Sequence, residues 1–241
     1  MKGGERPSRP GLIWEKLGAA RKKSGSGLSL ERIVDAAITI ADNEGIQALS
    51  MRRIAAELGS GVMSLYRHIR RKDDLLDLLL DAAYGEVELP RHRDGWRTEL
   101  RLVAVRTRQA LKRHTWLGTL LQRRPPLGPN YLRYFEYCLE CVADLDLDIR
   151  SMTRAVGTLQ VFVLGFVAFE LEELANDRRI KMSETERRRV VEPYLTSILS
   201  TGAFPELARF LEIESSAPDD RDFLFGVDSL LDGIQARLAA R

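Results

Sequence analysis

A short basic stretch near the front of the chain carries residue types suited to contacting a phosphate backbone. Residues 58–72 read LGSGVMSLYRHIRRK and combine two glycines, a tyrosine, a histidine and four Arg or Lys. Guanidinium, ammonium and phenol groups donate hydrogen bonds to phosphate oxygens, and arginine also pairs with guanine edges. The stretch therefore indicates contact with nucleic acid, and its histidine is better suited to a phosphate than to catalysis.

The net charge hides this segment because the two ends of the chain differ in sign. The 241 residues have a net charge of only +2. Residues 1–28 hold seven Lys or Arg and two Glu, whereas residues 126–241 hold 13 basic and 20 acidic residues. This asymmetry favours a front that meets a polyanion and a rear with another task. Residues 91–124, with a net charge of +8, either face DNA or pair with the acidic rear.

Other chemistry has little support in the sequence. Cys138 and Cys141 are too few for a disulfide framework, and the three histidines show no metal-ligand spacing. We find no glycine-rich phosphate loop, no zinc motif and no nucleophile with a base nearby. We therefore expect no enzymatic activity, no metal and no cofactor, and the role of the cysteines stays open.

The pattern of apolar residues predicts an all-α chain. Apolar residues recur at helical spacing, and no alternating strand pattern is present. Ser29 and Ser50 are expected N-caps, and Gly45 and Gly59 are expected to end the helices that follow them. A fourth helix is expected to open at Asp73. Later helices are expected at 95–113, 115–122, 130–144, 150–176, 184–200 and 221–239.

Residues 50–69 have the dimensions of a helix-turn-helix. Two helices of about two turns each flank a three-residue connection that contains glycine. Val62, Leu65 and Ile69 are expected to line the inner face of the second helix. The outer face, which could enter a major groove, then carries Met63, Ser64 and Arg67. The same geometry occurs in enzymes and protein-binding modules, but the aromatic and basic cluster favours DNA.

The segment LSMRRIAAELGSGVMSLYRHIRRKDDLLDLLLDA resembles the N-terminal domain of the TetR family of bacterial transcriptional regulators. The shared pattern is a small-residue helix, an LG turn, and LYxH followed by a hydrophobic residue and a lysine three positions on. The resemblance covers residues 29–88. Ile69 is one departure, because many members have phenylalanine there; an aliphatic residue at this position resembles the tetracycline repressor's own branch. Gly61 is a second departure, because it disfavours helix near the start of the recognition helix.

The resemblance implies DNA-binding roles for eight residues. Arg52, near the start of the helix before the turn, would reach a base or phosphate. Met63, Ser64 and Arg67 would face base edges, and Tyr66, His68 and Lys72 would grip phosphates. These residues are Arg52, Val62, Met63, Ser64, Tyr66, Arg67, His68 and Lys72. The basic N-terminal arm either adds such contacts or touches nothing.

The two most apolar helices of the rear, 150–176 and 221–239, are either a core or a surface that pairs with a second copy. The resemblance implies the second alternative, because the last two long helices of the family form a four-helix dimer interface. Two recognition helices would then meet two half-sites of a pseudo-palindrome. The expected interface residues are Gly157, Val161, Gly165, Phe223, Val227, Leu230, Leu231 and Ile234.

Aromatic residues with polar tips gather in the middle of the chain. An apolar pocket with a few polar groups is what a small-molecule site needs, although each residue taken alone is more often core or surface. The candidate ligand-binding residues are His114, Trp116, Tyr131, Tyr134, Gln160 and Phe162. The resemblance implies that a ligand here shifts the fourth helix and re-spaces the two DNA-reading units.

We therefore expect three parts: a flexible basic N-terminal arm at 1–28, a helix-turn-helix DNA-binding domain at 29–75 and a helical ligand-binding and dimerisation domain at 76–241. The resemblance implies a cytoplasmic, nucleoid-associated regulator that binds double-stranded operator DNA as a homodimer. By the family's habit it would be a repressor released by a small hydrophobic or aromatic effector. A helical adaptor and a DNA-binding activator remain the alternatives. No membrane partner is expected, because the longest apolar run, VFVLGFVAF, is only about half as long as a membrane-spanning helix.

Overall fold

The computed structural model describes residues 12–14, 28–90, 94–179, 184–211 and 219–239. The regular structure of these residues is helical, which confirms the expected all-α fold. The elements are α2 Leu30–Glu44, the 3-10 helix η1 Ile46–Ala48, α3 Met51–Glu57, α4 Val62–Tyr66, α5 Lys72–Gly85, α6 Trp96–Arg113, α7 Trp116–Arg123, α8 Pro129–Cys141, α9 Ile149–Arg179, α10 Glu184–Leu199, α11 Pro205–Leu211 and α12 Asp220–Ala239.

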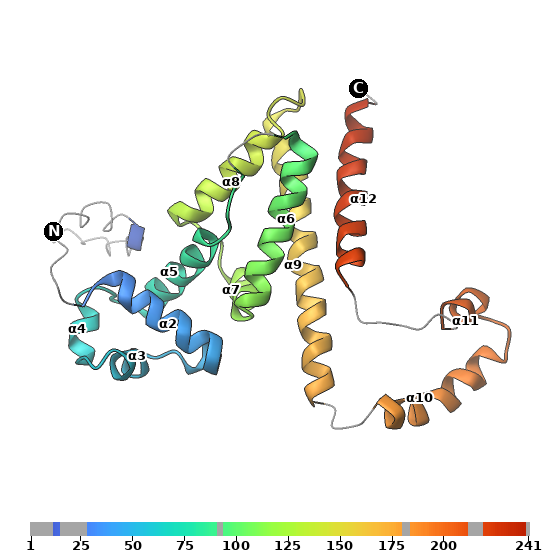
Figure 1. Ribbon diagram of the computed structural model, residues 1–241, viewed down its shortest axis with the longest axis horizontal. Helices are drawn as coiled ribbons and strands as arrows, with labels where there is room; N and C mark the ends of the chain where they lie inside the picture. Colours follow the sequence, from blue (N-terminus) through green and yellow to red (C-terminus); the bar gives the residue numbers. More distant parts are fainter. Residues whose placement is uncertain (1–11, 15–27, 91–93, 180–183, 212–218, 240–241) are drawn as a thin grey trace, which may run out of the picture.

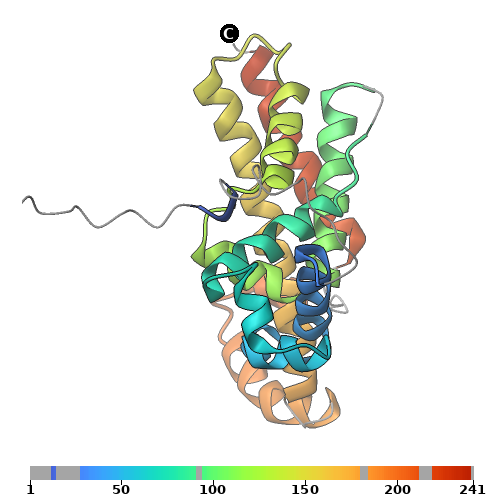
Figure 2. The ribbon, with the colours of Figure 1, turned by 90° about the vertical axis from the view of Figure 1, so that its left-hand side faces the viewer.

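The helices form a small N-terminal unit, a larger body and a projecting pair (Figure 1). Helices α2, α3 and α4 pack together and are called the head below, and α5 runs from the head into the body. In the body α6 and α8 pack against α9, and α12 lies along α6 and α9. Helices α10 and α11 extend away from the body, and in the view turned by 90° they lie at its lower end (Figure 2).

Local capping explains where the helices of the head begin and end. The Ser29 hydroxyl accepts a hydrogen bond from the Arg32 amide at 3.3 Å, and the Ser50 hydroxyl accepts one from the Arg53 amide at 3.1 Å. Gly59 has a φ of +59°, a left-handed conformation that glycine adopts at little cost. It turns the chain between α3 and α4, as the sequence predicts.

Helix α4 is shorter than the sequence indicates. Gly61 is its N-cap, so this glycine lies just outside the helix, where it is well accepted. The helix ends at Tyr66 and does not reach Ile69. Ile69 is nevertheless fully buried, because its amide bonds to the Leu65 carbonyl at 2.9 Å and the chain keeps turning inward. The expected inner face is therefore preserved across a shorter helix.

Three other features differ from the expectation. Neither η1 nor α11 is predicted by the apolar pattern, because both are too short to show a period. Helix α8 ends at Cys141 and not at residue 144, because the amides of Val142 and Ala143 bond to carbonyls only three residues back. Such bonds tighten the last turn of a helix and end it.

Part of the N-terminal arm packs on the body. Ile13 is only 4% exposed, and Trp14 packs against the same core. Leu12 and Trp14 also line a small cleft with Leu80 of α5 and the loop residues Pro125 to Gly128. At these positions the structure differs from an unpacked arm, because large apolar side chains gain by leaving water. Residues 1–11 and 15–27 lie outside the described residues.

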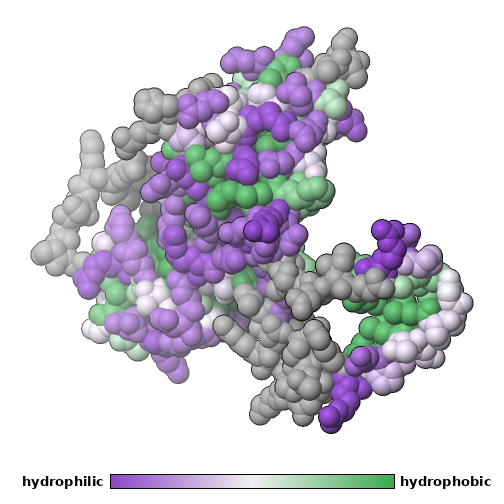
Figure 3. Space-filling view, turned by 45° about the vertical axis from the view of Figure 1, so that its right-hand side comes forward, coloured by the Kyte–Doolittle hydropathy of each residue, from purple (hydrophilic) through white to green (hydrophobic). Residues whose placement is uncertain are grey.

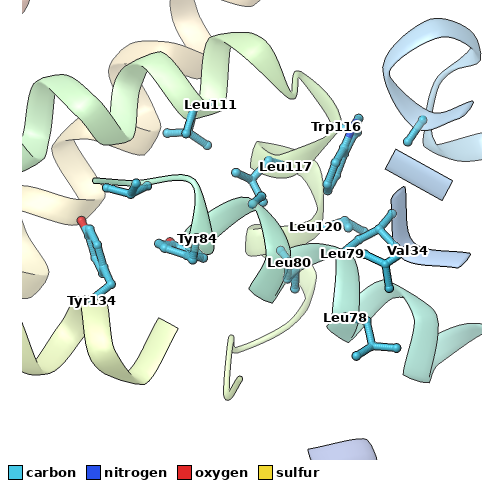
Figure 4. Packing of buried hydrophobic residues seen from close by; sticks show 14 of the residues in the cluster. Val34, Leu78, Leu79, Leu80, Tyr84, Leu111, Trp116, Leu117, Leu120 and Tyr134 are labelled. Carbon is cyan, nitrogen blue, oxygen red and sulfur yellow. The ribbon is translucent and has the colours of Figure 1, made fainter. Parts of the chain in front are cut away.

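One apolar core joins the head to the body through α5 (Figure 4). Leu79 and Leu80 of α5 are buried, and Val34 of α2 and Leu120 of α7 lie beside them. Full burial of one leucine stabilises a fold by about 1.5–3 kcal/mol. The head is therefore held on the body by packing along α5, and the expected domain boundary at residue 75 lies inside this helix.

Part of the basic segment 91–124 pairs with the acidic rear, as one of the two alternatives left by the sequence predicts. Arg106, Arg113 and Arg124 instead pair with Glu88, Glu86 and Asp77, which lie in and just after α5. Arginines spaced along α6 reach carboxylates on α9 and α12. The pairs are Arg97–Asp232 at 2.5 Å, Arg101–Asp228 at 3.0 Å, Arg108–Glu170 at 2.6 Å and Arg108–Asp220 at 2.7 Å. These charges therefore hold α6 to α9 and α12.

Arg108 and Glu170 form a buried ion pair at the centre of this arrangement. Arg108 is 7% exposed and Glu170 is 6% exposed. The guanidinium donates two hydrogen bonds to the carboxylate, at 2.8 and 2.6 Å, and lies 4.7 Å from the centre of the Phe223 ring. Burial raises the pKa of Glu170, but hydrogen bonds from Arg108 and Lys112 outweigh burial and leave this pKa below its ordinary value.

Helix α9 has more apolar surface than the chain itself covers. Its segment Ile149–Glu173, 25 residues long, contains an 18-residue window with a mean hydropathy of 1.6 and is long and apolar enough to cross a membrane by length and composition alone. Only 28% of its most apolar window is buried within the chain. A helix of this composition is equally suited to a protein interface, where a second chain covers the open face.

Replacing Arg108 by methionine tests the buried pair. Arg108→Met keeps an unbranched side chain but leaves Glu170 buried without its main partner. We expect the free energy of unfolding at pH 7 to fall by about 3–5 kcal/mol, because removing one partner strands the charge of the other. Urea unfolding followed by circular dichroism, at one protein concentration, measures the loss.

The control is Arg97→Met, which breaks an exposed pair from the same helix and is expected to cost less than about 1 kcal/mol. The pKa of Glu170 is lowered in the folded chain, so its ion-pair contribution is present above the ordinary glutamate pKa of 4.5 and is lost as the pH falls below it. Equal losses for both variants would show that burial of the pair is unimportant.

Candidate DNA-binding surface and ligand cavity

Helix α4 turns an open face to solvent. Met63 is 76% exposed and Tyr66 is 43% exposed, and Arg67 is exposed directly after the helix. Val62 and Ser64 are half-buried, and Val62 also packs against the core. The residues expected to meet base edges therefore lie on or beside one open face, while the other face of the helix holds the head together.

A basic surface continues from α4 into the start of α5. His68 and Lys72 are exposed, and Lys72 is the first residue of α5. Arg71, which lies between them, donates a hydrogen bond to Asp74 at 2.7 Å, and this bond raises the pKa of Arg71. His68 and Lys72 are thus placed to contact a phosphate backbone, whereas Arg71 is already engaged with a carboxylate.

The two adjacent arginines of α3 have different environments. Arg53 pairs with Glu44 at 2.6 Å and with Glu57 at 2.9 Å, and these hydrogen bonds raise its pKa above the ordinary value. Arg52 is exposed and forms no ion pair within the described parts of the chain. Arg53 therefore joins α3 to the end of α2, whereas Arg52 remains exposed on α3.

A cavity of about 110 Å³ lies in the body between α5, α6, α7, α8 and α9. It includes Tyr131, Tyr134 and Gln160, three of the six expected ligand-binding residues. The other lining residues come from helices on every side. The full lining is Tyr84, Thr107, Leu121, Pro126, Tyr131, Tyr134, Gln160 and Leu164.

Three tyrosines form one wall of the cavity. The Tyr84 ring centre lies 4.9 Å from that of Tyr131 and 5.1 Å from that of Tyr134, and Figure 4 shows Tyr84 and Tyr134 in this part of the core. Burial raises the pKa of all three phenols, so they remain neutral hydrogen-bonding groups at physiological pH. Edge-to-face and tilted rings of this kind provide an aromatic surface with polar ends.

Gln160 and Thr107 supply the polar groups of the cavity. The Thr107 hydroxyl donates to the Val103 carbonyl at 2.8 Å and lies 3.1 Å from the Tyr134 hydroxyl. The Gln160 side chain lies near the Tyr134 hydroxyl, where burial raises the pKa and this contact partly offsets the rise, but its buried Nε2 atom makes no hydrogen bond of good geometry among the residues that the structure describes. A buried donor without a partner costs about 1–3 kcal/mol, so this amide is suited to meeting an acceptor on a bound molecule.

The structure places the other three expected ligand-binding residues elsewhere. His114 and Trp116 face Asp42 of the head, because their ring nitrogens find a carboxylate there. Phe162 packs between α9 and α12, and a Cβ on Gly226 would overlap its ring. Aromatic residues with polar tips thus belong to two different sites, the cavity and the contact with Asp42. Their spacing along the sequence does not tell these two sites apart.

Five lining residues were not among the candidates, namely Tyr84, Thr107, Leu121, Pro126 and Leu164. Tyr84 offered a usable signal, since it ends the apolar run of α5 with an aromatic ring and a polar tip. The leucines and the proline offered none, because their types are equally common in any core.

An open apolar face runs along α9 and α12. Val161 is 70% exposed and Phe225 is 76% exposed, and Gly165 is also exposed. Other expected interface residues are half-buried: Gly157, Leu230 and Ile234. This face remains uncovered in the single chain.

Three expected interface residues lie instead inside the chain. Phe223 and Val227 are 0% exposed and Leu231 is 1% exposed. They follow one another at i, i+4 and i+8, so they form the stripe of α12 that packs on its own chain. Phe225, two residues from Phe223, points the other way and belongs to the open face.

The projecting pair α10 and α11 also carries exposed apolar residues, which gather on this part of the surface in Figure 3. They include Tyr194 at 64% and Phe210 at 56% exposed.

The two cysteines are buried thiols: burial raises the pKa of Cys138 to about 12 and also raises that of Cys141. Thiols with raised pKa values are poor nucleophiles.

Comparison with known proteins agrees with the division into a head and a body. The family model "Bacterial regulatory proteins, tetR family" matches residues 33–79, and the model "Tetracyclin repressor-like, C-terminal domain" matches residues 89–238. The first match contains the helix-turn-helix, and the second contains the cavity and the open apolar face.

Curated and solved relatives show the same likeness. The HTH-type transcriptional repressor DrrR1 of Streptomyces coeruleorubidus is 35% identical over 232 residues, which cover 95% of this chain and 86% of the relative. The crystal structure of apo ActR from Streptomyces coelicolor has a TM-score of 0.75 at 30% identity and covers 90% of this chain and 99% of that chain. The complex of ActR with actinorhodin has a TM-score of 0.73 at 31% identity and covers 88% and 99%.

The second family match extends over more than half of the chain, and the relatives align along nearly its whole length. The helix-turn-helix with its open α4 face and the aromatic cavity behind it are the parts that such regulators need. The chain belongs to the TetR family of bacterial transcriptional regulators, which bind DNA, respond to ligands and are not enzymes.

Proposed function

We propose that this protein is a homodimeric repressor that binds a pseudo-palindromic operator and is released when a small aromatic molecule enters the tyrosine cavity. The observation that carries the proposal is the open face of α4. Met63 is 76% exposed on a helix whose inner residue Leu65 is fully buried. A large apolar side chain held out from a rigid head is suited to contacting base edges, including thymine methyl groups.

The open face of α9 and α12 supports the homodimer. Val161 and Phe225 would leave water if the same face of a second chain packed against them, and exposed apolar patches of this kind mark interfaces. Small residues such as Gly165 allow two helices to approach closely. A two-fold axis through this face would set two heads side by side, which fits a pseudo-palindromic operator.

The cavity supports an aromatic effector with an acceptor group. The tyrosine rings offer stacking and edge contacts, and Gln160 Nε2 offers an unused donor. The similar ActR has been solved with actinorhodin bound, which makes actinorhodin the first compound to test. At about 110 Å³ the cavity is smaller than the roughly 300–1,000 Å³ of typical ligand pockets, so a ligand of that size must enlarge it.

The DNA-binding role places the protein in the cytoplasm, where operator DNA is found, and we extend this to association with the nucleoid. The apolar helix α9 is assigned to the dimer rather than to a membrane. Its side chain Glu170 lies within the apolar segment and is paired with Arg108 of the same chain, which fits a helix packed in a protein.

The DNA-binding proposal is tested with the region upstream of the protein's own gene. Wild-type protein should shift this DNA specifically, with an affinity that falls steeply as salt rises. Arg67→Ala should weaken binding by about 1–3 kcal/mol, because a guanidinium at a base edge contributes about that much. The control Arg209→Ala removes an exposed arginine on α11 and should leave binding unchanged. Full affinity of Arg67→Ala would remove Arg67 from the interface.

Gln160→Leu tests the polar end of the cavity. We expect this substitution to weaken binding of an acceptor-bearing aromatic ligand about tenfold, since one hydrogen bond to a buried donor is lost. Isothermal titration with actinorhodin, or with hits from a thermal-shift screen of aromatic compounds, measures the change. Gln122→Leu, an exposed position on α7, is the matched control. Identical affinities for the two variants would place the ligand elsewhere.

Val161→Asp tests the dimer. A carboxylate on the open face would be desolvated without a partner if two copies met there, which costs several kcal/mol. Light scattering at micromolar concentration should therefore give twice 27.3 kDa for the wild type and 27.3 kDa for the variant. Val191→Asp on α10 is the control and should stay dimeric. A monomeric wild type would contradict the dimer.

A further inference from the structure

We infer that a polar cluster between head and body fixes the angle of the DNA-reading head, and that its members are positioning residues for operator recognition. The cluster consists of Asp42, Glu86, His114 and Trp116 and is called the interdomain cluster here. The inference rests on the proposed function, because it says how the body sets the head. It also gives a role to His114 and Trp116, which the sequence placed among the candidate ligand-binding residues.

One oxygen of the head takes contacts from two residues of the body. Asp42 lies near the end of α2, and its Oδ1 atom is 2.8 Å from His114 Nδ1. The same oxygen accepts a hydrogen bond from Trp116 Nε1 at 2.7 Å. Within the described parts of the chain, no other side chain of α2, α3 or α4 hydrogen-bonds to α6 or α7.

The body side of the cluster is rigid. His114 and Trp116 are each 3% exposed, and their rings lie 5.4 Å apart. The His114 amide bonds to the Ala110 carbonyl at 2.9 Å, and its carbonyl accepts from the Leu117 amide at 2.8 Å. His114 is thereby held at the junction of α6 and α7, so its ring has little freedom to follow a moving head.

The second ring nitrogen fastens the end of α5 to the same junction. His114 Nε2 lies 3.1 Å from Glu86 Oε1, and Glu86 also pairs with Arg113. The cluster therefore ties α2, the end of α5 and the α6–α7 junction at one point. Apolar packing along α5 is non-directional and tolerates small rotations, whereas hydrogen bonds weaken steeply with angle. The interdomain cluster is thus the contact that can select one head angle.

Helix α7 links this cluster to the ligand cavity. Trp116 is its first residue and donates a hydrogen bond to Asp42, and Leu121, five residues further on, lines the cavity. At about 1.5 Å per residue, the two positions are separated by roughly two turns of helix or less. A ligand that displaces Leu121 and shifts α7 would also move Trp116, and with it the hydrogen bond that Asp42 accepts.

Head position can be measured without knowing the ligand or operator. A nitroxide at Met63→Cys, an exposed site on α4, reports the distance between the two heads of the dimer by pulsed electron double resonance; the native cysteines are buried and unreactive. We expect a narrow distance distribution in the otherwise wild-type protein. Asp42→Ala should broaden it, whereas Asp35→Ala, an exposed position on the same helix, should not.

Operator binding provides the second readout. Asp42→Ala and Trp116→Phe should each lower operator affinity about tenfold, a typical coupling between sites, with thermal melting still showing a folded chain. The double variant should lose about tenfold and not a hundredfold, because both changes remove the same contact. Trp116→Phe keeps an aromatic ring but removes part of the buried indole together with the N–H donor, so its effect is compared with that of Asp42→Ala, which removes the acceptor.

The outcomes separate the two proposals. No dipolar signal in the labelled wild type would overturn the dimer, and no specific operator binding by the wild type would overturn the proposed function. A narrow distribution that Asp42→Ala leaves unchanged would overturn the positioning role of the cluster. Additive losses in the double variant would overturn it as well, because they would assign the two side chains to separate effects.

Discussion

Helix α5 must be buried on two sides at once, and the arrangement of head and body follows from that constraint. Leu75 and Leu79 are fully buried, and Leu80 is 1% exposed. Asp81 is also buried, which raises the pKa of its carboxyl, but its oxygens accept from the Asn130 and Tyr131 amides at the start of α8. A carboxylate at a helix N-terminus complements the helix dipole, so α5 orders both the leucine core and α8.

The charge distribution has a structural purpose beyond DNA binding. Arginines of α6 point to carboxylates of α9 and α12, so the acidic rear partly neutralises the basic middle inside one chain. Among the described residues, the cations that follow α4 and open α5 form no such ion pairs, except Arg71, which pairs with Asp74. The basic segments 58–72 and 91–124 therefore differ in what their described charges meet: those on α6 are largely paired within the chain, and those beside α4 stay open to a polyanion.

Local features were readable from the sequence, and features made by several helices were not. The caps at Ser29 and Ser50 and the turn at Gly59 depend on neighbouring residues, so type and spacing are enough. The cavity depends on side chains from five elements, whose meeting is decided by packing. The roles of Phe223 and Phe225 could not be separated either, because α12 is apolar on both faces and periodicity does not say which face meets a partner.

The cavity and the interdomain cluster both include residues of α7. A ligand can shift the head only through a difference in its affinity for two arrangements of the protein. Tyr84 and Tyr134 are buried, whereas Leu121 of α7, Tyr131 of α8 and Gln160 and Leu164 of α9 are half-buried. Helix α7 begins at Trp116, which donates a hydrogen bond to Asp42 of the head. Enlarging the cavity on the α7 side would therefore also change the contact that holds the head.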